Sequence, residues 1–215
     1  MKIKKIGVLK CARCSFLRNT SDPFLDQIVT CDEKWTLYDN RKRSGQWLDH
    51  DESPKYFPKP KLHQQKVMVT AWWSAIGVVH YSFLEASQSI TAKVYCNQRA
   101  EMHAHLQKMR PALVNRRDPI LLYDNAKSHV TRMTLQEITD LGYEILPDPP
   151  YSDLSPTDYH FLKHLNTFFS DKTFRFKLEV DSTFKDFLTS KPISFYQRGI
   201  NNLVDRWQRC SRPIL

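Results

Sequence analysis

The sequence "ILLYDNAKSH", residues 120–129, decides the fold because it ends a short apolar run with an acid. Ile120, Leu121 and Leu122 form the run, and a tyrosine and Asp124 follow it. Buried strands of α/β sheets are apolar along their length, and the chemistry of such sheets lies just beyond the strand ends. The stretch therefore predicts a buried strand that carries Asp124 to one edge of a sheet.

The segments before this stretch have the pattern of an antiparallel meander. "LDQIVTCDEKW" (25–35) carries an apolar run into Asp32, and "WTLYD" (35–39) follows after a short break. "KVMVTAWWSAIGVVHYSFL" (66–84) has the pattern of two further strands that fold back at residues 75–77. Its two adjacent tryptophans are expected to be core residues on opposite faces of the sheet.

Helices and short strands alternate in the rest of the chain. A helical pattern begins at Thr91 and ends or kinks at Pro111, and a second helix is expected from about Ala126 to Leu141. The inward-facing residues predicted for this second helix are Val130, Met133, Ile138 and Leu141. The remaining predicted elements are a strand at 143–146, a helix from about Thr157, and helices at about 178–189 and 194–208. This order predicts an α/β fold, a mixed sheet of antiparallel meander plus parallel strands flanked by helices, which matches the ribonuclease-H-like architecture.

The charge of the chain favours a polyanionic partner. Lys and Arg number 32 against 23 Asp and Glu, which gives a formal net charge of +9. Basic residues gather in two clusters that also contain tryptophan, tyrosine and phenylalanine, as in many nucleic-acid-binding surfaces. The predicted DNA-binding residues in these clusters are Arg41, Lys42, Arg43, Lys59, Lys61 and Lys66. Each cluster alone could equally be a solvated loop, but together they predict nucleic-acid binding.

Other features of the composition predict a folded protein inside the cell. Hydrophobic residues make up 41% of the 215 residues, which suits one globular domain. We expect no membrane partner, because no apolar run approaches the roughly 18 residues of a membrane span. The five cysteines are odd in number and scattered, which is typical of a reducing compartment.

Three acids are candidates for metal-dependent chemistry. Asp32 and Asp124 each end an apolar stretch, and Asp158 opens an amphipathic helix. Each alone could be an ordinary turn or helix-start acid. Phosphoryl transfer with two metal ions, however, needs carboxylates from separate elements that converge on ions roughly 4 Å apart. Asp153 is a rival for the third position, although it lies in a loop without helical support.

Four motifs resemble the catalytic domain of mariner-type transposases of the Tc1/mariner superfamily. They are "VTCDEKW", "SPKYFPKPKLHQQKVMVTAWWSAIGVVHYSFL", "ILLYDNAKSHV" and "PPYSDLSPTDYHFLKHL". The resemblance runs from about Phe16 to Arg212 and implies a ribonuclease-H-like fold with DNA cleavage and strand transfer dependent on Mg²⁺ or Mn²⁺. Asp32, Asp124 and Asp158 fall on the family's three catalytic, metal-binding aspartates, which would hold two ions.

The resemblance also implies domain organisation, partners and location. It makes residues 1–23 a lead-in or linker and residues 24–212 the catalytic domain, with a clamp-like basic loop at about 40–66 for dimer and DNA contacts. The partners would be transposon-end and target DNA and a second copy of the chain, and the location would be the nucleus. The family's amino-terminal pair of helix-turn-helix units does not match any part of this sequence, so we expect a truncated transposase.

Departures from the family pattern leave more than one function open. The usual "DNARPH" is "DNAKSH" here, with Lys127 and Ser128 substituted, and "HPPYSPDL" is "DPPYSDL", which lacks one proline before Asp153. The leading interpretation is a transposase catalytic core, and the alternative is a catalytically inactive, DNA-binding or dimerising remnant. A general nuclease of the same fold is a third. Metal-dependent nicking separates the remnant from the two enzymes, and joining of a 3′ end to target DNA separates the transposase from the nuclease.

Overall fold

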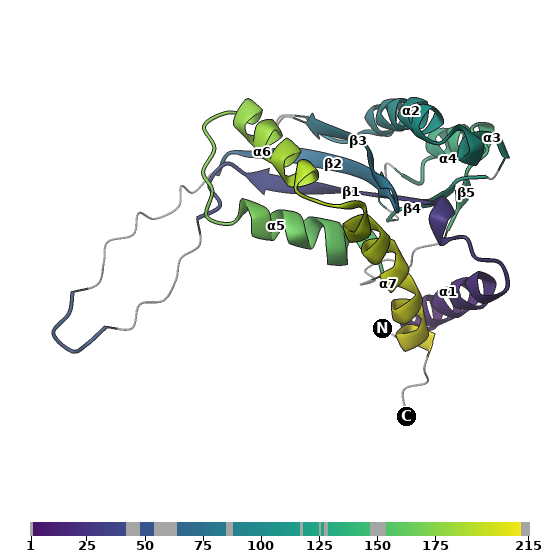
Figure 1. The fold of residues 1–215 in the computed structure, drawn as a ribbon, viewed down its shortest axis with the longest axis horizontal. Helices are drawn as coiled ribbons and strands as arrows, with labels where there is room; N and C mark the ends of the chain where they lie inside the picture. The colour runs from purple at the N-terminus through teal and green to yellow at the C-terminus, as the bar shows by residue number, and fades with distance from the viewer. Residues whose placement is uncertain are drawn as a thin grey trace.

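A five-stranded mixed sheet of order β3-β2-β1-β4-β5 forms the centre of the protein in a computed structural model (Figure 1). The strands are β1 (Ile28–Leu37), β2 (Lys66–Ser74), β3 (Gly77–Leu84), β4 (Ile120–Leu122) and β5 (Glu144–Ile145). The structure describes residues 2–41, 48–53, 64–84, 88–116, 118–124, 126, 129–146 and 154–211, and the side chains of 12–210 within these ranges. The first three strands form an antiparallel meander, and β4 and β5 add to it in parallel, which is a ribonuclease-H-like fold.

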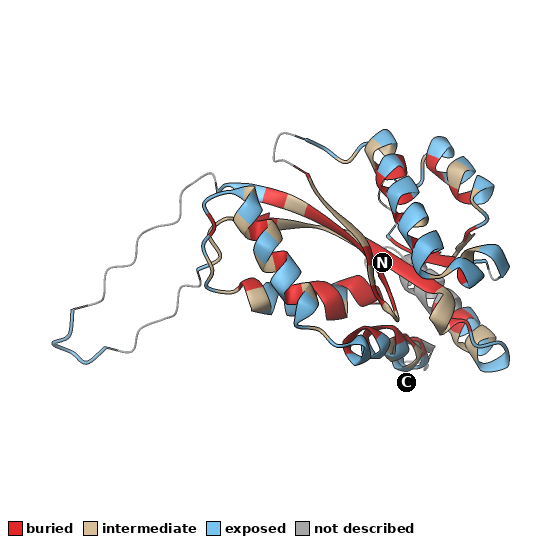
Figure 2. Cartoon of the chain, turned by 45° about the horizontal axis from the view of Figure 1, so that its top comes forward, coloured by how far each residue is buried: buried red, intermediate tan, exposed pale blue. Residues whose placement is uncertain are grey.

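Helices cover both faces of this sheet. They are α1 (Lys2–Ser21), the 3₁₀ turn η1 (Leu25–Gln27), α2 (Ala92–Met109), α3 (Pro111–Arg116), α4 (Arg132–Asp140), the π-helix η2 (Thr157–Leu162), α5 (Lys163–Phe169), α6 (Lys177–Thr189) and α7 (Ile193–Ser211). One hydrophobic core joins one sheet face to α1, α5, α6 and α7, and a second joins the other face to α2, α3 and α4 (Figure 2). Within the described residues, no helix has the length and apolarity needed to cross a membrane.

The two adjacent tryptophans of β2 anchor these two cores. Trp72 and Trp73 are both fully buried, and they point to opposite faces because successive side chains of a strand alternate. Trp72 packs on Tyr95 of α2 with ring centroids 5.4 Å apart, and Trp73 stacks on Phe161 of η2 at 5.7 Å. The predicted placement of both tryptophans is therefore confirmed.

The central strand β1 runs further than its sequence pattern indicates. It continues unbroken from Ile28 to Leu37, across the break expected near residue 35. Pairing with β2 along nearly its whole length, with Glu33 opposite Thr70 and Trp35 opposite Met68, keeps the strand straight there. Long-range ladder hydrogen bonds outweigh the local pattern at this position.

The helix predicted from about Ala126 to Leu141 is shorter in the structure. It begins at Arg132, after Thr131, whose hydroxyl accepts a hydrogen bond from the backbone N–H of Thr134 at 3.2 Å. The predicted inward positions of Val130 and Met133 are wrong, since these side chains are 44% and 50% exposed. The predicted inward positions of Ile138 and Leu141 are confirmed, since Ile138 is buried and Leu141 packs against the second core. Because the helix starts later, Thr134 joins Ile138 on its buried face.

Residues 1–23, predicted as a lead-in, contain a helix that packs on the domain. Helix α1 lies against α7 (Figure 1), and Phe24 just after it contacts Trp207 of α7 at a ring-centroid distance of 5.9 Å. Arg18 of α1 forms a bidentate ion pair with Glu144 of β5 and lies 4.6 Å from the ring centroid of Phe24. The predicted domain boundary at residue 24 stays a prediction.

Gly199 allows α7 to approach the sheet and η2 closely. A Cβ atom at this position would lie 2.6 Å from Cδ2 of His160 and 2.7 Å from Cη2 of Trp73. Both neighbours are buried, so neither can move aside freely. The absence of a side chain at Gly199 is thus a packing requirement.

We predict that Gly199→Ala lowers the free energy of unfolding by about 1 to 2 kcal/mol, because the cost of overpacking exceeds the roughly 1 kcal/mol that alanine gains over glycine in a helix. Urea denaturation followed by circular dichroism measures this. Asn201→Ala, at an exposed position of the same helix, is the control and should leave stability equal or slightly higher. Equal stability of the two variants would contradict the close contact.

Candidate active site

The three candidate acids come from three elements that meet at one edge of the sheet. Strands β1 and β4 are parallel neighbours, and Thr30 of β1 is paired with Leu122 of β4. Asp32 and Asp124 each follow this pair by two residues, the spacing at which side chains of a strand point to the same face. Asp158 lies in the first turn of η2, and Thr157, the residue directly before it, is hydrogen-bonded to Thr30. Asp32 is half-buried, and Asp124 and Asp158 are exposed.

Asp32 and Asp158 form a carboxyl pair. Burial, the negative charge of Asp158 and a hydrogen bond between the two carboxyl groups together raise the pKa of Asp32 to about 8, against the lowering effect of the Glu33 backbone N–H. That N–H donates to Oδ1 of Asp32 at 2.7 Å. In the absence of a cation the pair therefore holds a proton at neutral pH, because two adjacent carboxylates repel each other.

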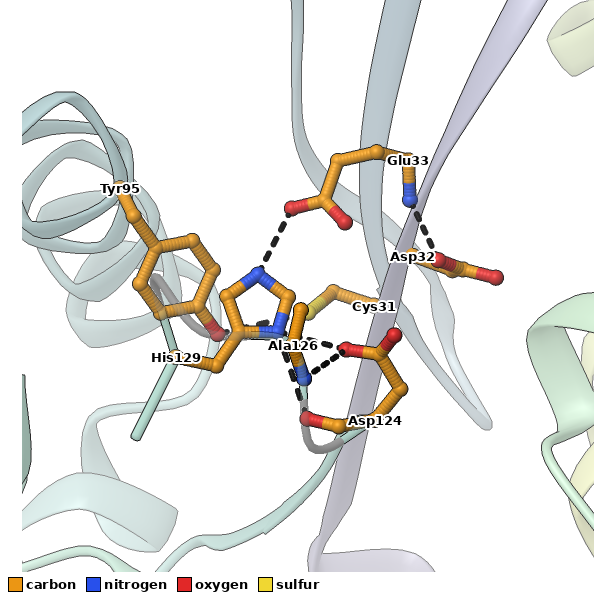
Figure 3. A network of polar contacts seen from close by, with 7 residues as sticks. All are labelled: Cys31, Asp32, Glu33, Tyr95, Asp124, Ala126 and His129. Atoms are coloured by element: carbon orange, nitrogen blue, oxygen red, sulfur yellow. Dashed lines mark hydrogen bonds and ion pairs between the residues drawn. The ribbon is translucent and has the colours of Figure 1, made fainter. Parts of the chain in front are cut away.

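Asp124 is held by His129 rather than by the other two acids (Figure 3). Oδ1 of Asp124 lies 2.7 Å from Nδ1 of His129 and accepts a hydrogen bond from the backbone N–H of Ala126 at 3.1 Å. The opposite ring nitrogen, Nε2 of His129, lies 3.0 Å from Oε1 of Glu33. One imidazole thus bridges carboxylates from β1 and from the loop after β4.

The electrostatics of this bridge favour a charged histidine. Burial lowers the pKa of His129, but its hydrogen bonds and charge interactions with Asp124 and Glu33 outweigh burial and raise that pKa to about 9. At neutral pH both ring nitrogens therefore donate. The hydrogen bond from His129 in turn holds the pKa of Asp124 below its usual value, against the opposing effect of burial, so Asp124 stays ionised.

Aromatic residues fix the ring of His129. The Tyr95 ring lies 4.0 Å from the imidazole centroid at an interplanar angle of 32°, and the Tyr123 ring meets it edge-on at 5.6 Å. The Tyr95 hydroxyl lies 3.7 Å from Sγ of Cys31, which connects this packing to β1. His129 itself is 1% exposed, so its position is set by the surrounding protein.

The donor set suits a hard divalent cation. Carboxylate oxygens are the ligands that Mg²⁺ and Mn²⁺ prefer, and a cation beside Asp32 and Asp158 would offset their repulsion in place of the proton. Across the parts of the chain that the structure describes, no group of three or more His, Cys, Asp or Glu side chains is arranged to hold a metal ion. Asp32 and Asp158 are brought together, Asp124 is turned to His129, and the three-acid ligand set stays a prediction.

The predicted DNA-binding residues are only partly described. Lys42, Arg43, Lys59 and Lys61 lie outside the described residues, as does Asp153. Arg41 pairs with Asp39 through distances of 2.9 Å and 2.6 Å, and Nζ of Lys66 lies 4.2 Å above the Trp35 ring. Both basic residues sit where β1 and β2 lead into the segment between them.

Two residues of this site were not among the predicted ones, Glu33 and His129. The alternation of side chains along a strand could have indicated the position of Glu33. Because Glu33 directly follows Asp32, its side chain must point to the opposite face of β1, toward α2. His129 closes the quoted stretch "ILLYDNAKSH", five residues after Asp124. Its burial, however, depends on Tyr95 from a distant helix, which no local pattern reports.

Comparisons with known proteins find a transposase family and two related proteins. A family model described as "Transposase (partial DDE domain)" matches residues 37–116. The chain is 56% identical over 195 residues to histone-lysine N-methyltransferase SETMAR of Homo sapiens, covering 90% of this chain and 28% of that protein. It is 31% identical over 189 residues to the mariner Mos1 transposase of Drosophila mauritiana, covering 87% of this chain and 55% of that protein. The chain thus spans less than two thirds of either relative.

Solved structures of Mos1 transposase have the same fold. The paired-end complex with the left transposon end superposes with a TM-score of 0.92 at 30% identity, covering 98% of this chain and 62% of that one. The Mos1 catalytic domain with raltegravir and Mn superposes with a TM-score of 0.83 at 28% identity, covering 98% of this chain and 94% of that one.

We predict that Asp32→Asn stabilises the metal-free protein more at pH 9 than at pH 5. The folded chain keeps a proton on Asp32 up to a pKa of about 8, whereas the unfolded chain releases it near pH 4. Stability therefore falls as pH rises between these values and levels off above the higher one. After allowance for solvent screening, the gain at pH 9 should be roughly 2 kcal/mol, or about 4 to 8 °C in Tm.

Thermal unfolding in a chelator-containing buffer measures this difference. Asp205→Asn, at an exposed acid of α7, is the matched control for the loss of one carboxyl group. A constant effect of Asp32→Asn from pH 5 to pH 9 would contradict the raised pKa of Asp32 in the folded protein.

Proposed function

The chain belongs to the mariner-type transposases and carries their catalytic domain, and we propose that it cleaves DNA and transfers the cut strand in a metal-dependent reaction. The observation that carries the proposal is the convergence of Asp32 and Asp158 in one carboxyl pair beside the in-phase position of Asp124. Structural scaffolds do not ordinarily keep such a repulsive pair at a solvent-accessible sheet edge, whereas sites for divalent cations do.

The proposed cofactor is a pair of Mg²⁺ or Mn²⁺ ions, held by Asp32, Asp124 and Asp158. When bound, such ions activate a water or a 3′ hydroxyl and stabilise the leaving oxygen of the phosphodiester. Asp32 and Asp158 give up their shared proton on binding the cofactor, and His129 keeps Asp124 ionised and oriented. The solved Mos1 catalytic domain contains Mn, which supports divalent-metal use here.

The proposed substrates are transposon-end and target DNA. A Mos1 structure with 98% coverage of this chain holds a transposon end, and the net charge of +9 suits phosphate contacts. We further propose that residues 24–212 are the catalytic domain. Arg41, Lys66 and their neighbours in segment 40–66 would contact DNA. The active form would be a homodimer, and it would act in the nucleus. These last points rest on the family resemblance.

A second candidate function is a catalytically inactive, DNA-binding remnant. It is favoured by the turning of Asp124 to His129 and by the substitutions in "DNAKSH" and "DPPYSDL". A nicking assay on supercoiled plasmid with Mn²⁺ separates it from the enzyme, because a remnant binds DNA without cutting it. Joining of a 3′ end to a target plasmid then distinguishes the transposase from a general nuclease.

We predict that Asp32→Asn, Asp124→Asn and Asp158→Asn each lower Mn²⁺-dependent nicking by at least about 100-fold, since each removes a metal ligand. DNA affinity in a chelator should stay within about twofold of the parent, because phosphate contacts come from Lys and Arg. Asp205→Asn controls for the loss of one acid. Undiminished nicking in any of the three variants would remove that residue from the proposed site.

We also predict salt-sensitive DNA binding. Affinity for a random duplex should fall at least about tenfold between 50 and 200 mM salt, and Lys66→Gln should reduce the slope of log K against log salt by about 1. Fluorescence anisotropy titrations measure both. Lys185→Gln is the matched control, because Lys185 pairs with Asp181 on α6 at 2.6 Å. An unchanged affinity across these salt concentrations would argue against phosphate-dominated binding.

A further inference from the structure

A buried hydrogen-bond cluster contains Thr157, directly before Asp158, and Thr30, two residues before Asp32 on β1. The hydroxyl of Thr157 accepts a hydrogen bond from Nε1 of Trp73 at 3.0 Å and lies 3.0 Å from the hydroxyl of Thr30. Thr30, Trp73 and Thr157 are all fully buried. The cluster therefore ties β1, β2 and η2 together at one point inside the core.

The residues of this cluster lie on the same elements as the two acids. Thr30 and Asp32 are two residues apart on β1 and so face the same side, and Trp73 lies opposite Thr30 in the β1–β2 register. Thr157 directly precedes Asp158. A fixed contact between Thr30 and Thr157 thus sets how far Asp158 reaches toward Asp32.

The residues after Asp158 are anchored on the other side, by α7. The hydroxyl of Tyr159 donates to the carbonyl of Gly199 at 2.6 Å, and Nε2 of His160 donates to the carbonyl of Phe195 at 2.8 Å. Thr157, Tyr159 and His160 are therefore each bonded to another element, and the acid between them is left to meet Asp32.

The backbone of this segment also requires such anchors. Residues Thr157–Leu162 form a π-helix, a rare backbone form that is frequently found at functional sites. A less favoured backbone persists only where surrounding structure determines it. Relaxation to an ordinary α-helix would change the direction of Asp158 relative to the sheet.

We propose that Thr30, Trp73 and Thr157 act as a positioning triad, which sets the separation of the Asp32 and Asp158 carboxyl groups and thereby the affinity of the site for divalent cations. The proposal rests on the proposed function only in its choice of cation. The three residues do not touch the reacting groups and act through the two acids.

The test is Thr157→Val, which keeps the shape of the side chain and removes both hydrogen bonds. Mn²⁺ titration monitored by electron paramagnetic resonance, without DNA, should show about tenfold weaker binding, the usual scale for loss of a group that orients a metal ligand. Mg²⁺-dependent nicking should fall more than Mn²⁺-dependent nicking, because Mg²⁺ demands stricter geometry. The KM for DNA should not change.

Matched variants separate positioning from general destabilisation. Thr70→Val makes the same substitution at a buried β2 residue whose hydroxyl has no hydrogen-bond partner within the described structure, and it should leave Mn²⁺ affinity unchanged. Thr157→Ser keeps the hydroxyl and should restore most of the affinity. Should Thr157→Val fail to fold, Thr30→Val, which removes a single hydrogen bond, should show a smaller loss in the same direction.

Crystal structures of the metal-free parent and of Thr157→Val give a second readout, the separation of the Asp32 and Asp158 carboxyl groups. An unchanged separation, together with an Mn²⁺ affinity equal to that of Thr70→Val, would overturn the positioning role. If the parent cuts no DNA but Thr157→Val still alters the carboxyl separation, the proposed function fails and the positioning role stands.

Discussion

Repulsion between carboxylates at one sheet edge is the constraint on which the candidate site depends. Asp32 and Asp158 come together because a proton on one carboxyl group relieves their repulsion, and the hydrogen bond from charged His129 lowers the pKa of Asp124 below its usual value. The negative charge of the carboxyl pair is thus reduced by a proton, whereas that of Asp124 is balanced by the positive charge of His129. A cation of charge +2 could take the place of the proton on the first pair, while the histidine keeps the third acid available.

The two faces of β1 carry different parts of the candidate site. Thr30 and Asp32 face η2 and the larger core, whereas Cys31 and Glu33 face α2 and the smaller core. One strand therefore positions both the carboxyl pair and the histidine bridge, with a period of two residues. Trp72 and Trp73 of the neighbouring strand β2 are buried on opposite faces of the sheet. Because β1 pairs with β2, they help to hold in place the strand that carries part of both the carboxyl pair and the histidine bridge.

Features that depend on the local sequence pattern could be predicted from the sequence, whereas features that depend on contacts with distant segments could not. The apolar run before Asp124 predicted β4, with Asp124 just beyond its end, and Asp158 lies at the expected helix start. Asp32, which was expected at a strand end, lies instead in the middle of β1, because pairing with β2 extends that strand to Leu37. The start of α4 was placed too early, because the cap at Thr131 is not distinguished from its polar neighbours by pattern alone. The bridge through His129 could not be predicted, since its charge depends on Glu33, 96 residues away in sequence.

The anchoring of η2 by α7 has a consequence for the order in which the protein is made. Asp32 is synthesised early, but the turn that carries Asp158 bonds to Phe195 and Gly199 near the end of the described chain. Closing such long loops is costly in entropy until the later contacts form. A nascent chain therefore holds its first acid long before its carboxyl pair, and the assembled pair appears only after Phe195 and Gly199 have been synthesised.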